Sequence, residues 1–232
     1  DLHSFPTRRS SDLVLKGKDY FVFAKSVKKI TLKEEFNMFC IKVMVIGAGT
    51  MGSGIAQVFL THGCDVVLND IKQEFIDGGI KKIDKSLTKL VAKEKMTQAD
   101  KDAAMGRITS FVEITEDGMK DVDLVVEAAI DDMKIKAQIF KNLGEKCPAH
   151  TILASNTSSL PITKIAAATN RPDKVIGMHF FNPAPVMKLI EIINGIATSD
   201  ETFKKVFEAS QELGKSPVKV NDFPGFVGNR VV

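Results

Sequence analysis

The sequence predicts an α/β fold, a doubly wound and mostly parallel sheet with helices on both faces. Three observations support this prediction. Short apolar runs without polar alternation, typical of strands buried on both faces, recur along the chain. Helical stretches separate these runs, and a glycine-rich turn joins the first run to the first helical stretch.

The expected elements follow in order from residue 41. The run Ile41–Ile46 is apolar except for Lys42 and forms the first strand. The longest helical stretch, Gln73–Lys95, has one apolar face at helical spacing and many lysines elsewhere, which are expected to be solvated. Strands are expected at 41–46, 65–68, 122–127, 151–154 and 175–178, and helices at 53–61, 73–95 and 134–146.

The turn after the first strand predicts a dinucleotide site of the Rossmann type. Its glycines allow a tight turn and the close approach of a pyrophosphate to the helix N-terminus. Asp70 follows Gly47 by 23 residues, near the spacing of an acid that binds ribose hydroxyls. Such an acid repels a 2′-phosphate, so NAD is expected, although Lys72 leaves NADP open. The expected cofactor contacts are Gly47, Ala48, Gly49, Thr50, Met51, Gly52 and Asp70.

A histidine at the end of a later strand is the expected catalytic group. His179 follows Val175–Met178, at the edge where open α/β sheets bind ligands. Glu191, in the next apolar run, is expected to orient the imidazole, which could then exchange a proton with a hydroxyl or carbonyl near neutral pH. The alternative is a histidine packed among core phenylalanines. Ser155–Ser159 places small polar side chains at the same edge, or simply caps a helix.

Composition narrows the class of protein. The formal charge is +3, but the first 37 residues carry eight Lys/Arg against five Asp/Glu, while the rest of the chain carries 24 of each. This argues against a nucleic-acid or membrane partner for the body of the protein. Three scattered cysteines favour neither disulfides nor a metal site, and fit a reducing cytoplasm.

The first 37 residues are not expected to belong to the folded domain. Residues 1–13 resemble the translation of a sequencing adapter. Residues 14–37 show no clear period and end in Lys-Glu-Glu, whose codons can contain a ribosome-binding sequence, before Met38. We therefore expect a translated leader with Met38 as the start. The alternatives are a genuine basic extension or a mitochondrial presequence, and the acidic residues weigh against the presequence.

Several motifs together resemble the L-3-hydroxyacyl-CoA dehydrogenase family, and within it the bacterial 3-hydroxybutyryl-CoA dehydrogenases. The resemblance runs from about Ile41 to the last residue. The glycine turn alone is not specific, whereas the three middle motifs together are. The motifs are Gly47–Gly52, Ser155–Leu160, His179–Pro183, Met187–Glu191 and Pro224–Arg230.

The resemblance implies a role for each matching residue. His179 would be the acid/base held by Glu191, with Ser158 and Asn229 around the substrate carbonyl. Asp70 would bind the adenosine ribose. The further NAD contacts would be Asp131, which stands where many members have glutamate, Lys136, Ser158 and Asn182, and the coenzyme-A contacts would be Ser86 and Lys93.

The resemblance also implies a division of the chain. Residues 38–223 would be the NAD-binding domain, and 224–232 would begin an all-helical domain that is largely missing and that forms the homo-oligomer in the family. Gly228 departs from the usual valine. The fragment alone is therefore expected to be inactive.

The implied reaction is L-3-hydroxyacyl-CoA + NAD⁺ ⇌ 3-oxoacyl-CoA + NADH + H⁺, in a cytoplasmic enzyme. One alternative is a dehydrogenase that acts on free 3-hydroxyacids with a catalytic lysine and has no His–Glu pair. Another is a non-catalytic NAD-binding module. The sequence leaves acyl chain length, direction and oligomeric state open.

Overall fold

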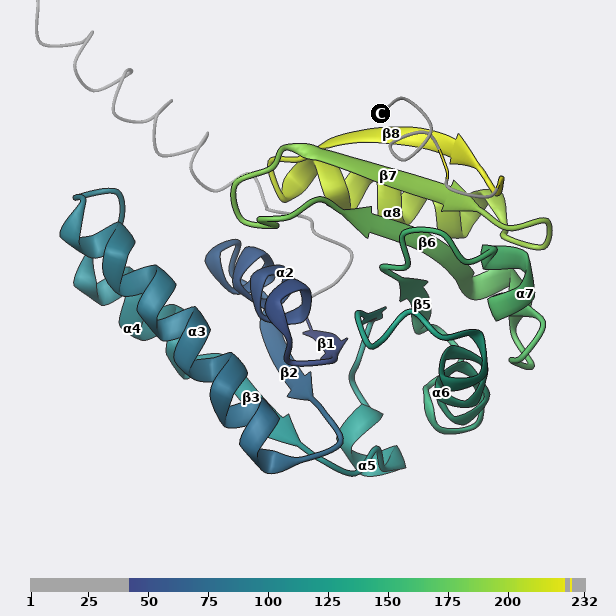
Figure 1. The fold of residues 1–232 in the computed structure, drawn as a ribbon, viewed down its shortest axis with the longest axis horizontal. Helices are drawn as coiled ribbons and strands as arrows, with labels where there is room; N and C mark the ends of the chain where they lie inside the picture. Colours follow the sequence, from purple (N-terminus) through teal and green to yellow (C-terminus); the bar gives the residue numbers. More distant parts are fainter. Residues whose placement is uncertain (1–41, 224–225, 227–232) are drawn as a thin grey trace, which may run out of the picture. The chain divides into compact units, whose positions relative to one another are not determined.

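The computed structural model describes residues 42–223 and residue 226. The C-terminal motif, apart from Phe226, lies outside these residues, so the expectations for Gly228 and Asn229 concern a part that is not described. The described chain forms one sheet with the strand order β3-β2-β1-β4-β5-β6-β7-β8 (Figure 1). The strands are β1 (Lys42–Ile46), β2 (Asp65–Asn69), β3 (Ile108–Phe111), β4 (Leu124–Glu127), β5 (Ile152–Ser155), β6 (Val175–Phe180), β7 (Leu189–Asn194) and β8 (Ser216–Asn221).

Helices connect most of the strands. They are α2 (Thr50–Thr61), α3 (Gln73–Ala92), α4 (Gln98–Gly106), α5 (Glu116–Met119), α6 (Met133–Lys146), α7 (Ile162–Ala166), a short 3₁₀ helix (Pro172–Lys174) and α8 (Asp200–Glu212). All neighbouring strands pair in parallel except β6 and β7, which are antiparallel. The predicted doubly wound, mostly parallel α/β fold is confirmed.

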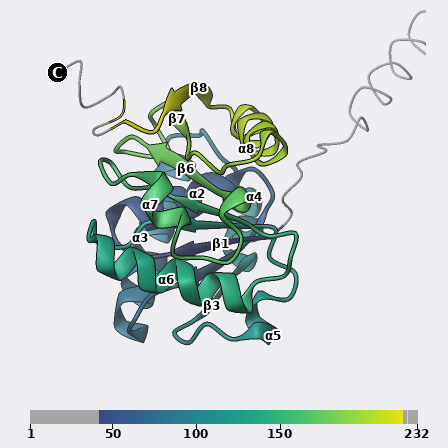
Figure 2. The same ribbon diagram turned by 90° about the vertical axis from the view of Figure 1, so that its right-hand side faces the viewer.

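The two faces of the sheet bury separate cores because side chains alternate along each strand. In β1, Val43 and Val45 pack on the side covered by α2, α3, α4 and α8. Met44 and Ile46 pack on the opposite side, with α5, α6 and α7. Figures 1 and 2 show α6 and α7 on the other side of the sheet from α3 and α4. Burial on both faces accounts for the nearly continuous apolar strands of the sequence.

The pairing of β6 with β7 places the expected catalytic residues opposite each other. His179 is the register partner of Glu191, and Gly177 is the partner of Ile193. A Cβ added at Gly177 would lie 2.8 Å from the Ile193 Cβ, so only glycine fits this pair without displacement. The close approach of the two strands at Gly177 therefore fixes the register two residues before the histidine.

Candidate active site

The glycine turn between β1 and α2 closes tightly on its neighbours. Gly47 has φ +95°, a left-handed conformation that glycine adopts at no steric cost. A Cβ added there would lie 2.7 Å from the carbonyl oxygen of Ala128, just after β4. A Cβ at Gly52 would lie 1.6 Å from the Gly47 carbonyl oxygen. Two of the three expected glycines are therefore required by packing.

Gly49 has a different function in the turn. It is the N-cap of α2 and offers no side chain to cap the helix. An added Cβ would meet no atom within 4 Å, so the backbone here borders open space. Helix N-termini carry partial positive charge and unpaired amides, which favour an anion. The turn therefore fits the pyrophosphate of a dinucleotide.

Asp70 lies directly beside this turn. Its Oδ2 accepts a hydrogen bond from the Ala48 amide at 2.7 Å, and its Oδ1 accepts one from the Ile71 amide at 2.7 Å. A carboxylate has about four acceptor positions, so each oxygen keeps about one for a ligand. The side chain is fixed and partly exposed, as an acceptor for two ribose hydroxyls requires.

A groove of about 990 Å³ begins at the turn and at Asp70. Apolar side chains line it, including Ile71, Ile130 and Ile135, which are among the most exposed aliphatic residues in the described part of the chain. A volume of this size and an apolar lining are typical of cofactor sites. The groove therefore fits the adenosine half of a dinucleotide.

His179 and Glu191 form a buried pair further along the same sheet edge. The His179 Nδ1 and the Glu191 Oε2 are 2.8 Å apart, and the side chains are 7% and 3% exposed. An ionised carboxylate only accepts hydrogen bonds, so in the neutral imidazole the proton is on Nδ1 and Nε2 is the acceptor. The pair that the free-acid alternative excluded is therefore present.

Aromatic rings surround this imidazole. The ring centroid of Phe181 lies 4.7 Å from that of His179, and the centroid of Phe226 lies 6.0 Å away. Phe226 is 1% exposed and has φ +48°, a strained conformation for a bulky residue. Such strain is found at sites where surrounding structure holds the residue in place. The rings shield the His179–Glu191 pair from water.

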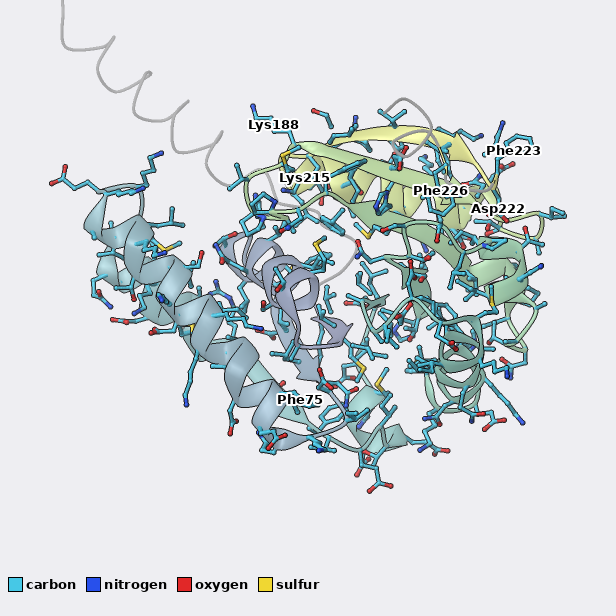
Figure 3. The ribbon with its side chains drawn as sticks, in the orientation of Figure 1. Phe75, Lys188, Lys215, Asp222, Phe223 and Phe226 are labelled. Carbon is cyan, nitrogen blue, oxygen red and sulfur yellow. The ribbon has the colours of Figure 1, made fainter. Side chains whose placement is uncertain are left out.

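The carboxylate of Asp222, just after β8, is hydrogen-bonded to the start of α7. Asp222 Oδ1 accepts from the Ile162 amide at 2.8 Å, and Oδ2 accepts from the Thr163 amide at 2.8 Å and from the Thr163 hydroxyl at 2.5 Å. These amides begin α7, whose own N-cap, Pro161, makes no side-chain cap. Figure 3 shows Asp222 and Phe226 in this region. Asp222 thus caps α7 and ties the end of β8 to it.

A lysine holds the loop between β6 and β7. Lys215 Nζ donates to the carbonyl oxygens of Ala184 at 2.6 Å and Met187 at 2.9 Å, and it is labelled in Figure 3. Partial burial lowers the pKa of Lys215. The loop also carries Asn182, whose side chain is exposed. Its predicted NAD contact remains a prediction.

Polar residues at the ends of β4 and β5 join the two halves of the site. The backbone amide of Asn156 donates to the backbone carbonyl oxygen of Glu127 at 2.7 Å. The side-chain Oδ1 of Asn156 accepts from the backbone amide of Phe180 at 2.8 Å. The Ser158 amide donates to Asp131 Oδ2 at 3.3 Å. The sequence prediction missed Asn156, which links β5 to the strand of His179.

A buried ion pair was also missed. Lys136 Nζ donates to Glu127 Oε1 at 2.7 Å and to Oε2 at 2.9 Å, and it lies 3.4 Å from Asp131 Oδ1. Ser155 Oγ donates to Glu127 Oε2 at 2.7 Å. The side chains of Lys136 and Glu127 are 1% and 0% exposed. The sequence showed the acid, because Glu127 ends an otherwise apolar strand, but it did not show which residue pairs with it.

The residues expected to bind coenzyme A lie apart from the groove. Ser86 is half-buried on α3, and Lys93 is the exposed C-cap of that helix. Neither lines the groove. Within the described residues, no cluster of three or more His, Cys, Asp or Glu side chains is placed to hold a metal, and no helix is both long and apolar enough to cross a membrane.

The fold and the site together define an NAD-binding dehydrogenase domain. The sequence model described as "3-hydroxyacyl-CoA dehydrogenase, NAD binding domain" matches residues 42–223. The chain therefore belongs to the 3-hydroxyacyl-CoA dehydrogenase family, which confirms the resemblance predicted from its motifs.

The chain is similar to several proteins named as hydroxyacyl-CoA or 3-hydroxybutyryl-CoA dehydrogenases. The chain is 52% identical over 191 residues to a 3-hydroxybutyryl-CoA dehydrogenase of Clostridioides difficile, covering 82% of this chain and 67% of that protein. It is 44% identical over 212 residues to the human mitochondrial hydroxyacyl-coenzyme A dehydrogenase, covering 89% and 65%. A crystal structure of (S)-3-hydroxybutyryl-CoA dehydrogenase from Ralstonia eutropha matches with a TM-score of 0.80 and 45% identity, covering 83% and 67%. The chain thus spans about two thirds of the length of these relatives.

Proposed function

We propose that the protein oxidises L-3-hydroxyacyl-CoA to 3-oxoacyl-CoA with NAD, or catalyses the reverse reduction, and that 3-hydroxybutyryl-CoA is its substrate. The observation that carries this proposal is the His179–Glu191 pair, 2.8 Å apart and buried. Because β6 is parallel to β5, the pair lies at the same sheet edge as the glycine turn. The names of the relatives support fatty acid or butanoate metabolism as the setting.

The chain supplies a proton acceptor and a charged partner for it. His179 Nε2 takes the proton of the substrate hydroxyl, and Glu191 stabilises the imidazolium that forms through the 2.8 Å contact at Nδ1. In the reverse direction His179 returns this proton to the carbonyl oxygen. NAD supplies the hydride acceptor at the same substrate carbon. Burial strengthens the interaction between imidazolium and carboxylate because the local dielectric is low.

Other residues remain proposals that rest on the family resemblance. Ser158 and Asn229 would position the substrate carbonyl, and Asn182 would contact NAD. Ser86 and Lys93 would contact coenzyme A. The exposure of Ser158 beside β5, at the edge that carries His179, supports its role.

A single substitution tests the proposed chemistry. In a version of the protein that includes the C-terminal helical domain, His179→Gln should lower kcat on acetoacetyl-CoA by about 10²–10⁴-fold, because the proton donor is lost, while NADH binding stays nearly intact. His150→Gln is the matched control: His150 precedes β5 at the opposite end of the strands, and its side chain is 56% exposed. Near-normal turnover of His179→Gln would remove this histidine from the mechanism. NADH binding without turnover in a version that includes the C-terminal helical domain, without other substitutions, would favour a non-catalytic module.

We further propose that the protein works as a cytoplasmic homodimer. Cys147 is a free, buried thiol, which is compatible with a reducing compartment. Leu189 and Val218 are exposed on one face of β7 and β8, and the nearby Phe223 is 58% exposed. Apolar surface of this kind is often covered in assemblies. Light scattering during size-exclusion chromatography measures the oligomeric state of a version that includes the C-terminal helical domain, and a monomer at micromolar concentration would contradict the proposal.

A further inference from the structure

Glu127 is a completely buried acid that the mechanism above does not use. It ends β4, and its two carboxylate oxygens accept four hydrogen bonds. Lys136 Nζ donates to both oxygens, Ser155 Oγ donates to Oε2 at 2.7 Å, and the Ala129 amide donates to Oε1 at 2.7 Å. A buried charge is costly, and such groups persist where every partner is satisfied. This carboxylate is therefore fixed in one position.

Lys136, which Glu127 holds, also lies near the more exposed carboxylate of Asp131. An ammonium group has three donors, and Lys136 directs its strongest contacts, at 2.7 and 2.9 Å, to Glu127. Its contact with Asp131 is longer, at 3.4 Å. The Asp131 side chain is 39% exposed, whereas Lys136 is 1% exposed. Lys136 therefore lies closer to Glu127 than to Asp131, with a further contact of 3.4 Å to the Ala129 carbonyl oxygen. Asp131 Oδ2 accepts a hydrogen bond from the Ser158 amide at 3.3 Å, and the carboxylate keeps acceptor positions for a ligand.

The strand order indicates which part of the cofactor Asp131 meets. Asp70 follows β2, the glycine turn follows β1, Asp131 follows β4, and His179 is the next-to-last residue of β6. A dinucleotide with its adenosine ribose at Asp70 and its pyrophosphate at the turn must continue along this edge past β4 and β5 to reach His179. The group beside Asp131 is then the second ribose, whose hydroxyls are hydrogen-bond donors for a carboxylate.

We propose that Glu127 is a positioning residue for the second ribose of NAD, acting through Lys136 on Asp131. Without the Glu127 charge, the Lys136 ammonium turns to Asp131 and closes a tight ion pair. The carboxylate of Asp131 is then no longer available to the ribose hydroxyls. This inference rests on NAD binding as part of the proposed function, but not on the acyl-CoA substrate.

Three ligands of increasing length test it by calorimetric titration. ADP reaches only the adenosine ribose and the pyrophosphate site, ADP-ribose adds the second ribose, and NADH adds the nicotinamide. Glu127→Gln should weaken ADP-ribose and NADH by at least about tenfold, since a hydrogen bond to a charged group is lost. ADP should bind within about twofold of the unsubstituted protein. Glu145→Gln, an exposed position on α6, is the matched control and should change none of the three.

A double-mutant cycle tests the route through Asp131. Asp131→Asn should weaken ADP-ribose by itself, and Glu127→Gln should add little in that background. Equal losses for ADP and ADP-ribose, or independent and additive effects of the two substitutions, would overturn the proposal.

Thermal unfolding checks that each variant folds. If Glu127→Gln does not fold, Ser155→Ala removes one bond to Glu127 but keeps its charge. It should weaken ADP-ribose more than ADP, and equal effects would contradict the proposal. Because only cofactor binding is measured, failure here is distinct from failure on acyl-CoA.

Discussion

Replacing Asp70 should change both the strength and the selectivity of cofactor binding. Each Asp70 oxygen already accepts one backbone amide at 2.7 Å, which leaves about two acceptor positions for the two hydroxyls of the adenosine ribose. A hydrogen bond to a charged group contributes about 1.5–3 kcal/mol. Loss of the stronger of these bonds in Asp70→Ala should therefore weaken NADH by about 10–10²-fold. NADPH should weaken less, because the variant also loses the carboxylate that repels the 2′-phosphate.

The assay is a titration with both reduced cofactors. The chain has no tryptophan, so the emission of the bound nicotinamide itself is the signal. Asp70→Asn keeps a side-chain acceptor but loses the charge, and its NADH affinity should fall between those of the alanine variant and the unsubstituted protein. Asp77→Ala, exposed on α3, is the control and should bind NADH normally. An unchanged ratio of NADH to NADPH affinity in Asp70→Ala would refute the assignment of Asp70 as the ribose acceptor.

Two further predictions concern the catalytic pair and its support. In a version that includes the C-terminal helical domain, Glu191→Gln keeps an acceptor for the imidazole but removes the charge, so kcat on acetoacetyl-CoA should fall by about 5–30-fold with NADH affinity unchanged. The exposed Glu208→Gln serves as the control, and an unaltered kcat in Glu191→Gln would show that the charge is not needed. Asp222→Ala removes the cap of α7 and should cost about 1–3 kcal/mol, lowering Tm by about 2–12 °C. A Tm equal to that of the exposed variant Asp121→Ala would contradict the capping role.

The first half of the fold could be predicted closely because apolar continuity and the glycine turn both point to it. The predicted elements err only at their ends, whereas α4, β3 and α5 were not predicted at all. α2 begins at Thr50 and not at Ser53, because Gly52, read as part of the turn, already lies in the helix. α3 ends at Ala92 and not at Lys95, because Glu94 takes a positive φ of 55° and stops the helix. Charged residues alone gave no sign of that backbone conformation.

The polar network behind the cofactor edge could not be predicted in the same way. Glu127 looks like the polar end of an apolar strand, and Lys136 was expected only as an NAD contact, with no sign of an acidic partner. Only the fold shows that the start of α6 brings this lysine over the end of β4, where its ammonium lies 2.7 Å from the acid. Two oppositely charged residues nine positions apart carry no such signal, because the intervening turn sets their relation. The side-chain direction of a charged residue is therefore the part of the site that depends most on tertiary structure.

The His179–Glu191 pair is a different case, since its geometry follows from a connection that the sequence contains. Only eight residues, 181–188, separate β6 from β7. A parallel return needs a crossover of about a dozen residues or more, so β7 must run antiparallel to β6. In an antiparallel pair, the register that matches Gly177 with Ile193 necessarily matches His179 with Glu191. A slip of one residue would turn the carboxylate to the opposite face of the sheet and leave the histidine without a partner. The close contact between Gly177 and Ile193 means that the observed register requires a residue without a side chain at position 177, so the catalytic pair depends on this glycine.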